Sequence, residues 1–218
     1  MERQKKQNKI VTVIGHKGDG KTVLTELLTV ANDKPAIIAD PRGQYPTECR
    51  RRLSFKNPRQ LKLWIYDSTN FKEFYRYKLE LICSVDDENF QELAQLVYQM
   101  RSVNFVVDEV DMFFSAAATN KNYLYKIVHY GRHNLIDIIS TSRRPANISR
   151  NLTSQTDIFY FSKLNEPADI KYFKNICGDK YLNAVQNLPK YSFLEVKENG
   201  NISMIRTTEN EIRLIDKL

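Results

Sequence analysis

The sequence predicts an α/β protein with a mostly parallel sheet and helices on both of its faces. Short β-branched segments alternate along the chain with segments whose apolar residues recur at helical spacing. A strand, a helix and a second strand follow one another within residues 9–40, and strands joined in this way lie parallel. An Asn-Gly pair at residues 199–200 predicts a C-terminal β-hairpin.

The first unit begins with residues 9–15, KIVTVIG, whose β-branched apolar side chains are typical of a buried strand. Residues 21–33 predict a helix, because their apolar positions follow one another at helical spacing. These positions are Val23, Leu24, Leu27, Leu28 and Val30. Residues 35–40, PAIIAD, predict the second strand.

The middle of the chain repeats this alternation. Residues 77–84, YKLELICS, predict a strand, and residues 86–100 predict a helix with an acidic first turn. The apolar run at residues 104–107 predicts a third buried strand, which ends in acidic residues. Residues 120–133, NKNYLYKIVHYGRH, are typical of a helix.

The last third of the chain adds two apolar strands at residues 134–142 and 156–162. A helix is expected between Pro167 and Gly178, since proline is tolerated at the first helical position and glycine commonly ends a helix. Residues 191–207 alternate in polarity on both sides of the Asn-Gly pair, which indicates the hairpin.

Length and composition narrow the class of protein. We expect residues 1–218 to form a single domain, with a polar N-terminal tail at 1–8 and the hairpin and tail at 190–218. No apolar run is long enough for a transmembrane segment or a signal peptide, which favours a soluble intracellular protein. The net charge of +7 suits a polyanionic partner without requiring one.

Cysteines and histidines give no sign of a metal or disulfide framework. The three cysteines are scattered and form no Cys-x-x-Cys pair, which argues against disulfides and against zinc. The three histidines are equally scattered. These six residues are Cys49, Cys83, Cys177, His16, His129 and His133.

The segment GHKGDGKT matches the phosphate-loop pattern G-x-x-x-x-G-K-[ST], the Walker A motif, and stands between a strand and a helix as that pattern requires. Lys21 would contact the β- and γ-phosphates of ATP, and the Thr22 hydroxyl would bind Mg²⁺. The backbone amides of the loop and the start of the helix would surround the phosphates. The residues expected to bind ATP are Gly15, His16, Lys17, Gly18, Asp19, Gly20, Lys21, Thr22 and Val23.

The segment NFVVDEVD supplies the carboxylates that such a site needs, a Walker B motif. Asp108 and Glu109 follow a buried strand, at the edge where α/β sheets bind ligands. Asp108 would hold the Mg²⁺, and Glu109 would act as general base toward the attacking water. Asp111 is expected to be a surface acid or a helix cap.

Together these residues resemble the FtsK–HerA superfamily of P-loop ATPases, RecA-like (ASCE) ring-forming pumps that move DNA and sometimes protein. The segment IIADPRGQYP is similar to the family's Asp-Pro-x-Gly-Glu-Tyr pattern, with Gln44 in place of the usual acid. The segment SRRP stands where the family has Thr-Gln-Arg-Pro, so Arg143 occupies the sensor position normally held by glutamine. A guanidinium can only donate, so Arg143 would contact the γ-phosphate directly instead of orienting water.

The resemblance implies a homo-oligomeric ring, usually a hexamer, with ATP sites at subunit boundaries. In such rings an arginine from the neighbour stabilises the transition state. Arg132 best matches the position of that arginine, with Arg144 and Arg150 as alternatives. A surface cation without this role is the competing interpretation of Arg132.

A core of this size without further modules is most similar to the genome-packaging ATPases of membrane-containing icosahedral viruses. That likeness implies translocation of double-stranded DNA into a preformed capsid, in the host cytoplasm or at a virion vertex, with a capsid-vertex or membrane protein as a further partner. One alternative is an assembly or secretion pump of the filamentous-phage or conjugation type. Another is a nucleotide-binding scaffold with weak hydrolysis.

Three segments could contact DNA. Residues 49–59 offer five cations in a polar stretch, which could face a pore or simply solvent: Arg50, Arg51, Arg52, Lys56 and Arg59. Residues 115–122 combine small side chains with Lys121. Aromatic residues within 64–77 are interspersed with cations, but core and interface packing is the more expected role for them.

Overall fold

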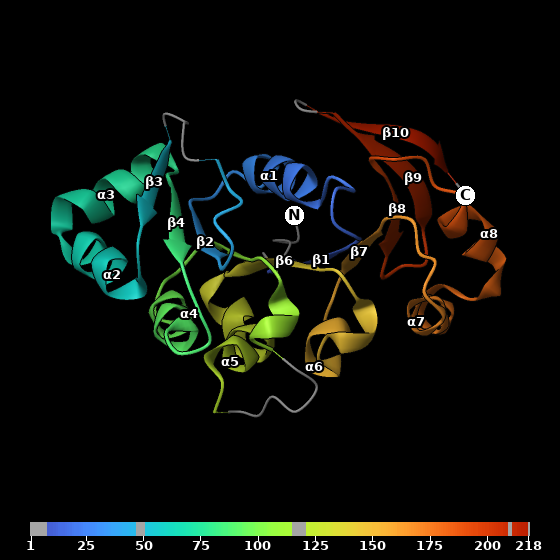
Figure 1. The fold of residues 1–218 in the computed structure, drawn as a ribbon. Helices are drawn as coiled ribbons and strands as arrows, with labels where there is room; N and C mark the ends of the chain where they lie inside the picture. Colours follow the sequence, from blue (N-terminus) through green and yellow to red (C-terminus); the bar gives the residue numbers. More distant parts are fainter. Residues whose placement is uncertain (1–7, 47–50, 115–120, 209–210, 218) are drawn as a thin grey trace, which may run out of the picture.

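The computed structural model describes residues 8–46, 51–114, 121–208 and 211–217, and its strands within these ranges form one ten-stranded sheet (Figure 1). The strand order is β10-β9-β8-β7-β1-β6-β5-β2-β4-β3. The strands are β1 (Ile10–Ile14), β2 (Ala36–Asp40), β3 (Arg52–Phe55), β4 (Glu80–Ser84), β5 (Asn104–Val107), β6 (Asp137–Ser142), β7 (Ile158–Phe161), β8 (Ser192–Lys197), β9 (Ile202–Thr207) and β10 (Ile212–Lys217).

The seven strands β1 to β7 are parallel, and β8 to β10 continue the sheet as antiparallel strands. Strand β6 lies between β1 and β5. It therefore separates β1, which leads into the phosphate loop, from β5, which leads into the acid pair. Because the strands are parallel, the carboxyl ends of β1, β5 and β6 meet at one edge of the sheet.

Helices cover both faces of the sheet, as predicted. Helix α1 packs on one face, α4, α5, α6 and α7 lie on the other, and α2 and α3 lie beside β3 at the end of the sheet (Figure 1). The helices are α1 (Lys21–Ala31), α2 (Pro58–Tyr66), α3 (Ser68–Tyr77), α4 (Phe90–Tyr98), α5 (Tyr123–Tyr130), α6 (Arg150–Thr153), α7 (Pro167–Cys177) and α8 (Leu182–Gln186). Short 3₁₀ turns are η1 (Val110–Met112), η2 (Gly131–Asn134), η3 (Pro145–Asn147) and η4 (Asp179–Tyr181).

The hydrophobic core has two layers, because successive side chains of a strand point to opposite faces. In β1, Val11 and Val13 pack toward the face that α1 covers, where they contact Leu24. Ile10 and Ile14 pack on the other face, within the larger cluster formed with the remaining helices. Burial on both faces explains why the parallel strands are continuous apolar runs instead of alternating patterns.

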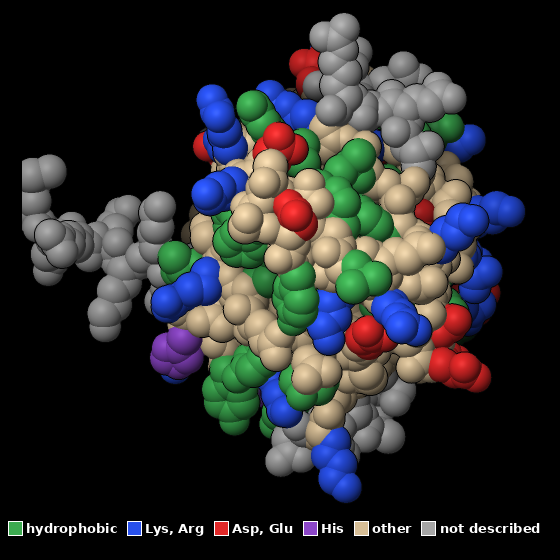
Figure 2. All heavy atoms as spheres, turned by 90° about the vertical axis from the view of Figure 1, so that its left-hand side faces the viewer, with side chains coloured by type: hydrophobic (Ala, Val, Ile, Leu, Met, Phe, Trp, Pro, Cys, Tyr) green, Lys and Arg blue, Asp and Glu red, His purple; other side chains and the backbone are tan. Residues whose placement is uncertain are grey.

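The basic segment at 49–59 contains an element that its composition concealed. Residues Arg52–Phe55 form β3, a short edge strand parallel to β4. Its RLSF sequence is brief and only partly buried, so no apolar run marks it. The aromatic segment that follows forms α2 and α3, where Phe74 is buried while Tyr66 and Phe71 remain exposed. Figure 2, which views this end of the molecule, shows apolar side chains interspersed with lysines and arginines.

The predicted C-terminal hairpin is present and longer than expected. Strands β8 and β9 pair antiparallel, and Gly200 in the turn has a φ of +81°, a conformation that glycine adopts without strain. Strand β10 then pairs with β9 as an added edge strand that the sequence analysis left open. Among the helices of the described residues, none combines the length and the apolar composition that a membrane-spanning helix needs.

Candidate functional site

The phosphate loop connects β1 to α1 at the carboxyl edge of the sheet. Gly18 and Gly20 have φ values of +87° and +90°, in the left-handed region that side chains other than glycine rarely adopt. Gly20 is also the residue from which α1 begins, so the backbone amides of the first helical turn point toward the loop. The predicted strand–loop–helix arrangement is therefore confirmed.

Three predicted residues shape this loop without lining its cavity. A Cβ on Gly15 would lie 2.3 Å from the Oγ of Ser162, which follows β7, so only glycine fits there. Ser162 donates a hydrogen bond from Oγ to Oδ2 of Asp19 at 2.6 Å, and the same oxygen accepts the His16 amide at 2.8 Å. Gly15, His16 and Asp19 thus hold the loop against the neighbouring strand.

Lys21 is buried at the base of the loop, with 9% of its surface exposed. Burial lowers the pKa of its ammonium group, and the nearby carboxylates Glu109 and Asp108 oppose that shift. Its Nζ donates to the His16 carbonyl at 3.1 Å. A buried cation that donates mainly to a loop carbonyl is suited to bind an anion, and phosphate oxygens would supply one.

The acid pair follows β5 at the same edge, and Thr141 on β6 connects its two members. The Thr141 hydroxyl donates to Oδ1 of Asp108 at 2.5 Å and accepts the Glu109 amide at 3.1 Å. Glu109 adopts a left-handed φ of +49°, which is uncommon for a residue with a side chain. This hydroxyl therefore helps to hold a strained backbone at the predicted general base.

Asp108 has the features of a group that binds a cation. Only 2% of the residue is exposed, and its buried Oδ2 has no hydrogen-bond partner among the residues that the structure describes. Burial raises the pKa of its carboxyl, and the hydrogen bond from Thr141 partly counteracts that effect. Thr22 lines the cavity and follows Lys21, whose pKa the Asp108 carboxylate raises. A carboxylate and a hydroxyl oxygen are thus available for Mg²⁺, which normally takes its remaining ligands from water and phosphates. The residues present fit this ion.

Arg143 extends from the end of β6 and pairs with Glu109. Its Nε donates to Oε1 of Glu109 at 2.7 Å, so the guanidinium at the predicted sensor position contacts the predicted general base directly. A γ-phosphate in this cavity would compete with Glu109 for the same cation. A glutamine at this position could not form such an ion pair.

Lys21, Glu109 and Arg143 line a cavity of about 280 Å³. Its lining includes two residues outside the predicted site, Gln44 and Tyr191. The Asp40 carboxylate accepts the amides of Arg42, Gln44 and Tyr45 at 3.0–3.1 Å, which folds the DPRGQY segment into a tight loop that brings Gln44 to the site. The full lining is Lys17, Gly18, Gly20, Lys21, Thr22, Val23, Gln44, Glu109, Arg143 and Tyr191.

Arg132 does not join this cluster. It is exposed in η2, which leads into the amino end of β6, whereas the phosphate loop follows the carboxyl end of β1. Since β1 and β6 are parallel, the two lie at opposite edges of the sheet. Arg132 could therefore reach a nucleotide only from a different copy of the chain. Of the two alternatives, Arg144 lies 3.8 Å from Glu166 and Arg150 begins α6.

The cations considered for DNA contact differ in exposure and in ion pairing. Arg52 donates to Glu80 at 2.6 Å and to Glu26 at 2.7 Å, with 8% of its side chain exposed, so neither of the roles considered for this segment, facing a pore or facing solvent, fits Arg52. Arg51, Lys56, Arg59 and Lys121 are exposed. Arg50, Cys49 and most of the 115–122 segment lie outside the described residues.

Comparison with known proteins supports the fold. No protein-family model and no curated protein sequence matches the chain. The genome packaging NTPase B204 from Sulfolobus turreted icosahedral virus 2, in complex with sulfate, is similar over 97% of this chain and 98% of its own, with a TM-score of 0.72 and 17% identity. Its complex with ATP-gammaS gives a TM-score of 0.70 and 18% identity, over 95% of this chain and 96% of that one.

VirB4 of Thermoanaerobacter pseudethanolicus is also similar, with a TM-score of 0.62 and 11% identity over all of this chain and 91% of that one. These likenesses confirm the predicted P-loop NTPase fold. They also confirm, at the level of the fold, the predicted resemblance to viral genome-packaging ATPases.

Proposed function

We propose that this protein is a Mg²⁺-dependent ATPase that translocates double-stranded DNA and packages a viral genome into a preformed capsid. The observation that carries the proposal is the convergence of Lys21, Asp108 and Glu109 at one edge of the sheet, with Thr141 between the two acids. The structural comparison supports the same assignment. This protein shares its fold with an NTPase that is named for genome packaging and whose structure was solved with ATP-gammaS.

In this proposal the loop amides and Lys21 hold the β- and γ-phosphates. Thr22 and Asp108 hold Mg²⁺, which when bound offsets charge on the phosphate oxygens. Glu109 accepts a proton from the water that attacks the γ-phosphate, which requires its carboxylate to be free of Arg143. Arg143 is then available to donate to the γ-phosphate oxygens.

We further propose that the working form is a ring of six copies, the number that the resemblance implies. Each chain would form a single domain of this ring. Arg132 of one chain would contribute to the ATP site of the next. Exposed cations such as Arg51 would bind the phosphate groups of the DNA backbone. A capsid-vertex or membrane protein would bind the ring in the host cytoplasm or at a virion vertex.

Steady-state ATP hydrolysis with Mg²⁺, with and without double-stranded DNA, tests the proposal. We expect DNA to stimulate hydrolysis, and the stimulation to weaken as salt rises, because backbone contacts release counterions. Glu109→Gln should lower hydrolysis by about 100-fold or more while ATP still binds, since the amide cannot take the proton.

Other results would favour the alternatives. Hydrolysis that DNA leaves unchanged, but that a coat or membrane protein stimulates, would contradict DNA translocation and indicate an assembly or secretion pump. Nucleotide binding without hydrolysis above the Glu109→Gln background would indicate a nucleotide-binding scaffold.

A further inference from the structure

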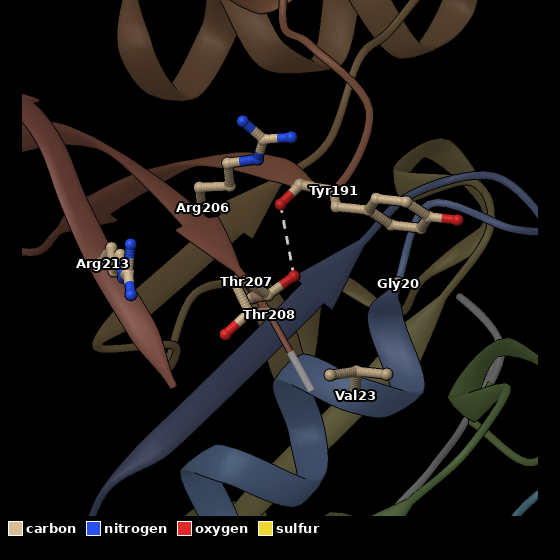
Figure 3. A pocket seen from close by; sticks show the side chains of 7 residues that line it. All are labelled: Gly20, Val23, Tyr191, Arg206, Thr207, Thr208 and Arg213. Atoms are coloured by element: carbon tan, nitrogen blue, oxygen red, sulfur yellow. Dashed lines mark hydrogen bonds between the residues drawn. The ribbon is translucent and has the colours of Figure 1, made fainter. Parts of the chain in front are cut away.

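A second cavity adjoins the phosphate loop, on the side of the C-terminal strands. Its volume is about 520 Å³, within the usual range for pockets that bind small molecules. It shares Gly20, Val23 and Tyr191 with the phosphate cavity, so the two spaces are neighbours. Its lining, drawn in Figure 3, is Gly20, Val23, Tyr191, Arg206, Thr207, Thr208 and Arg213.

We propose that this second cavity binds the base and sugar of the nucleoside triphosphate, with the Tyr191 ring as the stacking surface for the base. The inference rests on the proposed function, because it assumes that the phosphates occupy the loop. A nucleotide held there by its phosphates must place its nucleoside beside the start of α1, and the second cavity opens at Gly20 and Val23 of that region.

Tyr191 has the placement of a binding group. Its ring lies beside the loop, 3.1 Å from where a Cβ on Gly20 would stand, yet 42% of the residue is exposed. Its φ of +63° is unfavourable for a side chain as large as tyrosine. The Thr207 amide donates to the Tyr191 carbonyl at 2.9 Å and keeps this backbone in place.

A strained backbone that presents an exposed aromatic ring beside a phosphate site points to a role in binding. Aromatic rings stack on nucleobases of any identity, because every base has a flat face. In Figure 3 the Tyr191 ring extends over the Gly20 end of α1, while Arg206 and Arg213 lie on the other side of the cavity. The base would thus enter between the ring and the two arginines.

The arginines indicate what the cavity accepts. Arg206 and Arg213 are directly opposite in the β9–β10 pairing, where like charges repel. Glu211 offsets the positive charge of Arg213, whose Nε donates to the Glu211 carboxylate at 2.6 Å. Guanidinium groups can only donate, so they suit sugar hydroxyl oxygens and the acceptor atoms of a purine.

The hydroxyl groups of Thr207 and Thr208 also line the cavity, and a hydroxyl can donate or accept, so each suits the amino group of adenine as well as O6 of guanine. The N7 acceptor is common to adenine and guanine, and O6 of guanine is a further acceptor. The cavity therefore takes a purine nucleoside without strong preference, and ATP and GTP should bind with affinities within about tenfold of each other.

Calorimetric titration with Mg²⁺ present, using ATP, GTP and inorganic tripolyphosphate, tests the inference. Tripolyphosphate fills the loop and leaves the second cavity empty. Tyr191→Ala should weaken ATP binding by about tenfold or more and weaken tripolyphosphate binding much less, because stacking is lost while the loop amides and Lys21 still hold the phosphates. Tyr191→Phe keeps the ring and should recover most of the ATP affinity that Tyr191→Ala loses. Arg206→Ala should also weaken ATP binding selectively.

Tripolyphosphate binding reports in each variant that the loop is folded. If Tyr191→Ala lowers both affinities equally, or neither, the cavity is not the nucleoside site even though the phosphate site stands. If the unchanged protein binds neither ATP nor tripolyphosphate, both the proposed nucleotide site and the proposed nucleoside cavity are wrong. A preference for ATP over GTP of more than about 100-fold would overturn the stated lack of base selectivity.

Discussion

The hydroxyl group of Thr141 positions the two acidic residues of the site, Asp108 and Glu109. Its hydroxyl donates to the buried Asp108 carboxylate and accepts the amide of Glu109, whose backbone is strained. The sequence predicts Asp108 and Glu109 because they follow an apolar strand directly. It gives no comparable signal for Thr141, whose role depends on β6 lying next to β5.

Replacement of this hydroxyl tests its role. Thr141→Val keeps the shape but leaves a buried carboxylate oxygen unpaired, so we expect a loss of about 2 kcal/mol in the free energy of unfolding, measured with urea. Since the Thr141 hydrogen bond lowers the pKa of Asp108, its removal should raise that pKa further. The stability loss, measured without Mg²⁺ over a pH profile, should therefore shrink as the pH falls and Asp108 takes up a proton.

Thr141→Ser is the matched control, because it retains the hydroxyl and should stay close to the original protein in both measurements. If Thr141→Val left the stability and the pH profile unchanged, the hydroxyl would have no part in holding the acid pair.

The elements β1, β6 and α1 are tied together at the edge opposite the phosphate loop. Asp137, at the start of β6, is 3% exposed. Its Oδ1 accepts the Lys9 amide at 2.8 Å, and its Oδ2 accepts Asn32 at 2.9 Å and Lys34 at 2.5 Å. This one carboxylate thus fixes the central strand against the strand and helix that carry the loop.

Asp137→Ala should therefore be costly. It removes a buried carboxylate that accepts from the Lys9 amide, and it takes one of two acceptors from each of Asn32 and Lys34. We therefore expect a loss of about 3 kcal/mol in the free energy of unfolding, read from urea denaturation. The comparison variant is Asp179→Ala, which breaks the Lys174–Asp179 pair on the surface, where 79% of the aspartate side chain is exposed. That change should cost less than about 1 kcal/mol. Equal losses in the two variants would show that Asp137 does not join these elements.

At the scale of the whole molecule, the ATP site and Arg132 lie at opposite edges of one sheet. A head-to-tail contact between copies is the arrangement that can bring one edge to the other, and such contacts close into rings when the rotation between copies permits. The proposed ring thus accounts for an arginine that has no place in the site of its own chain.

Mixing two inactive variants tests this arrangement. Arg132→Ala and Glu109→Gln should each hydrolyse ATP poorly alone. In a mixed ring, a site between an Arg132→Ala chain and a Glu109→Gln chain can have both groups intact, so about a quarter of the sites should regain activity at equal proportions. Chains of Glu109→Gln mixed with Thr141→Val/Glu109→Gln should regain none. If the first mixture stays inactive although the chains form mixed rings, Arg132 does not act across a boundary.

The sequence by itself determined the central strands of the sheet, the helices α1, α4, α5 and α7, the phosphate loop and the acid pair. Each of these is encoded by neighbouring residues: glycines between a strand and a helix, or acids at the end of an apolar run. The short strand β3 and the added strand β10 escaped detection because both are edge strands, and a strand that buries little surface carries a weak apolar pattern.

Only the tertiary structure decided that β6 lies between β1 and β5, that Thr141 joins the two acids, and that Arg143 pairs with Glu109. It also brought Tyr191, from near the end of the chain, to Gly20 near its beginning. The physical reason is that such contacts depend on which strands pair and in what register, and a shift of one residue would turn every side chain to the other face. Local patterns specify a strand, whereas packing against the whole core selects its neighbours.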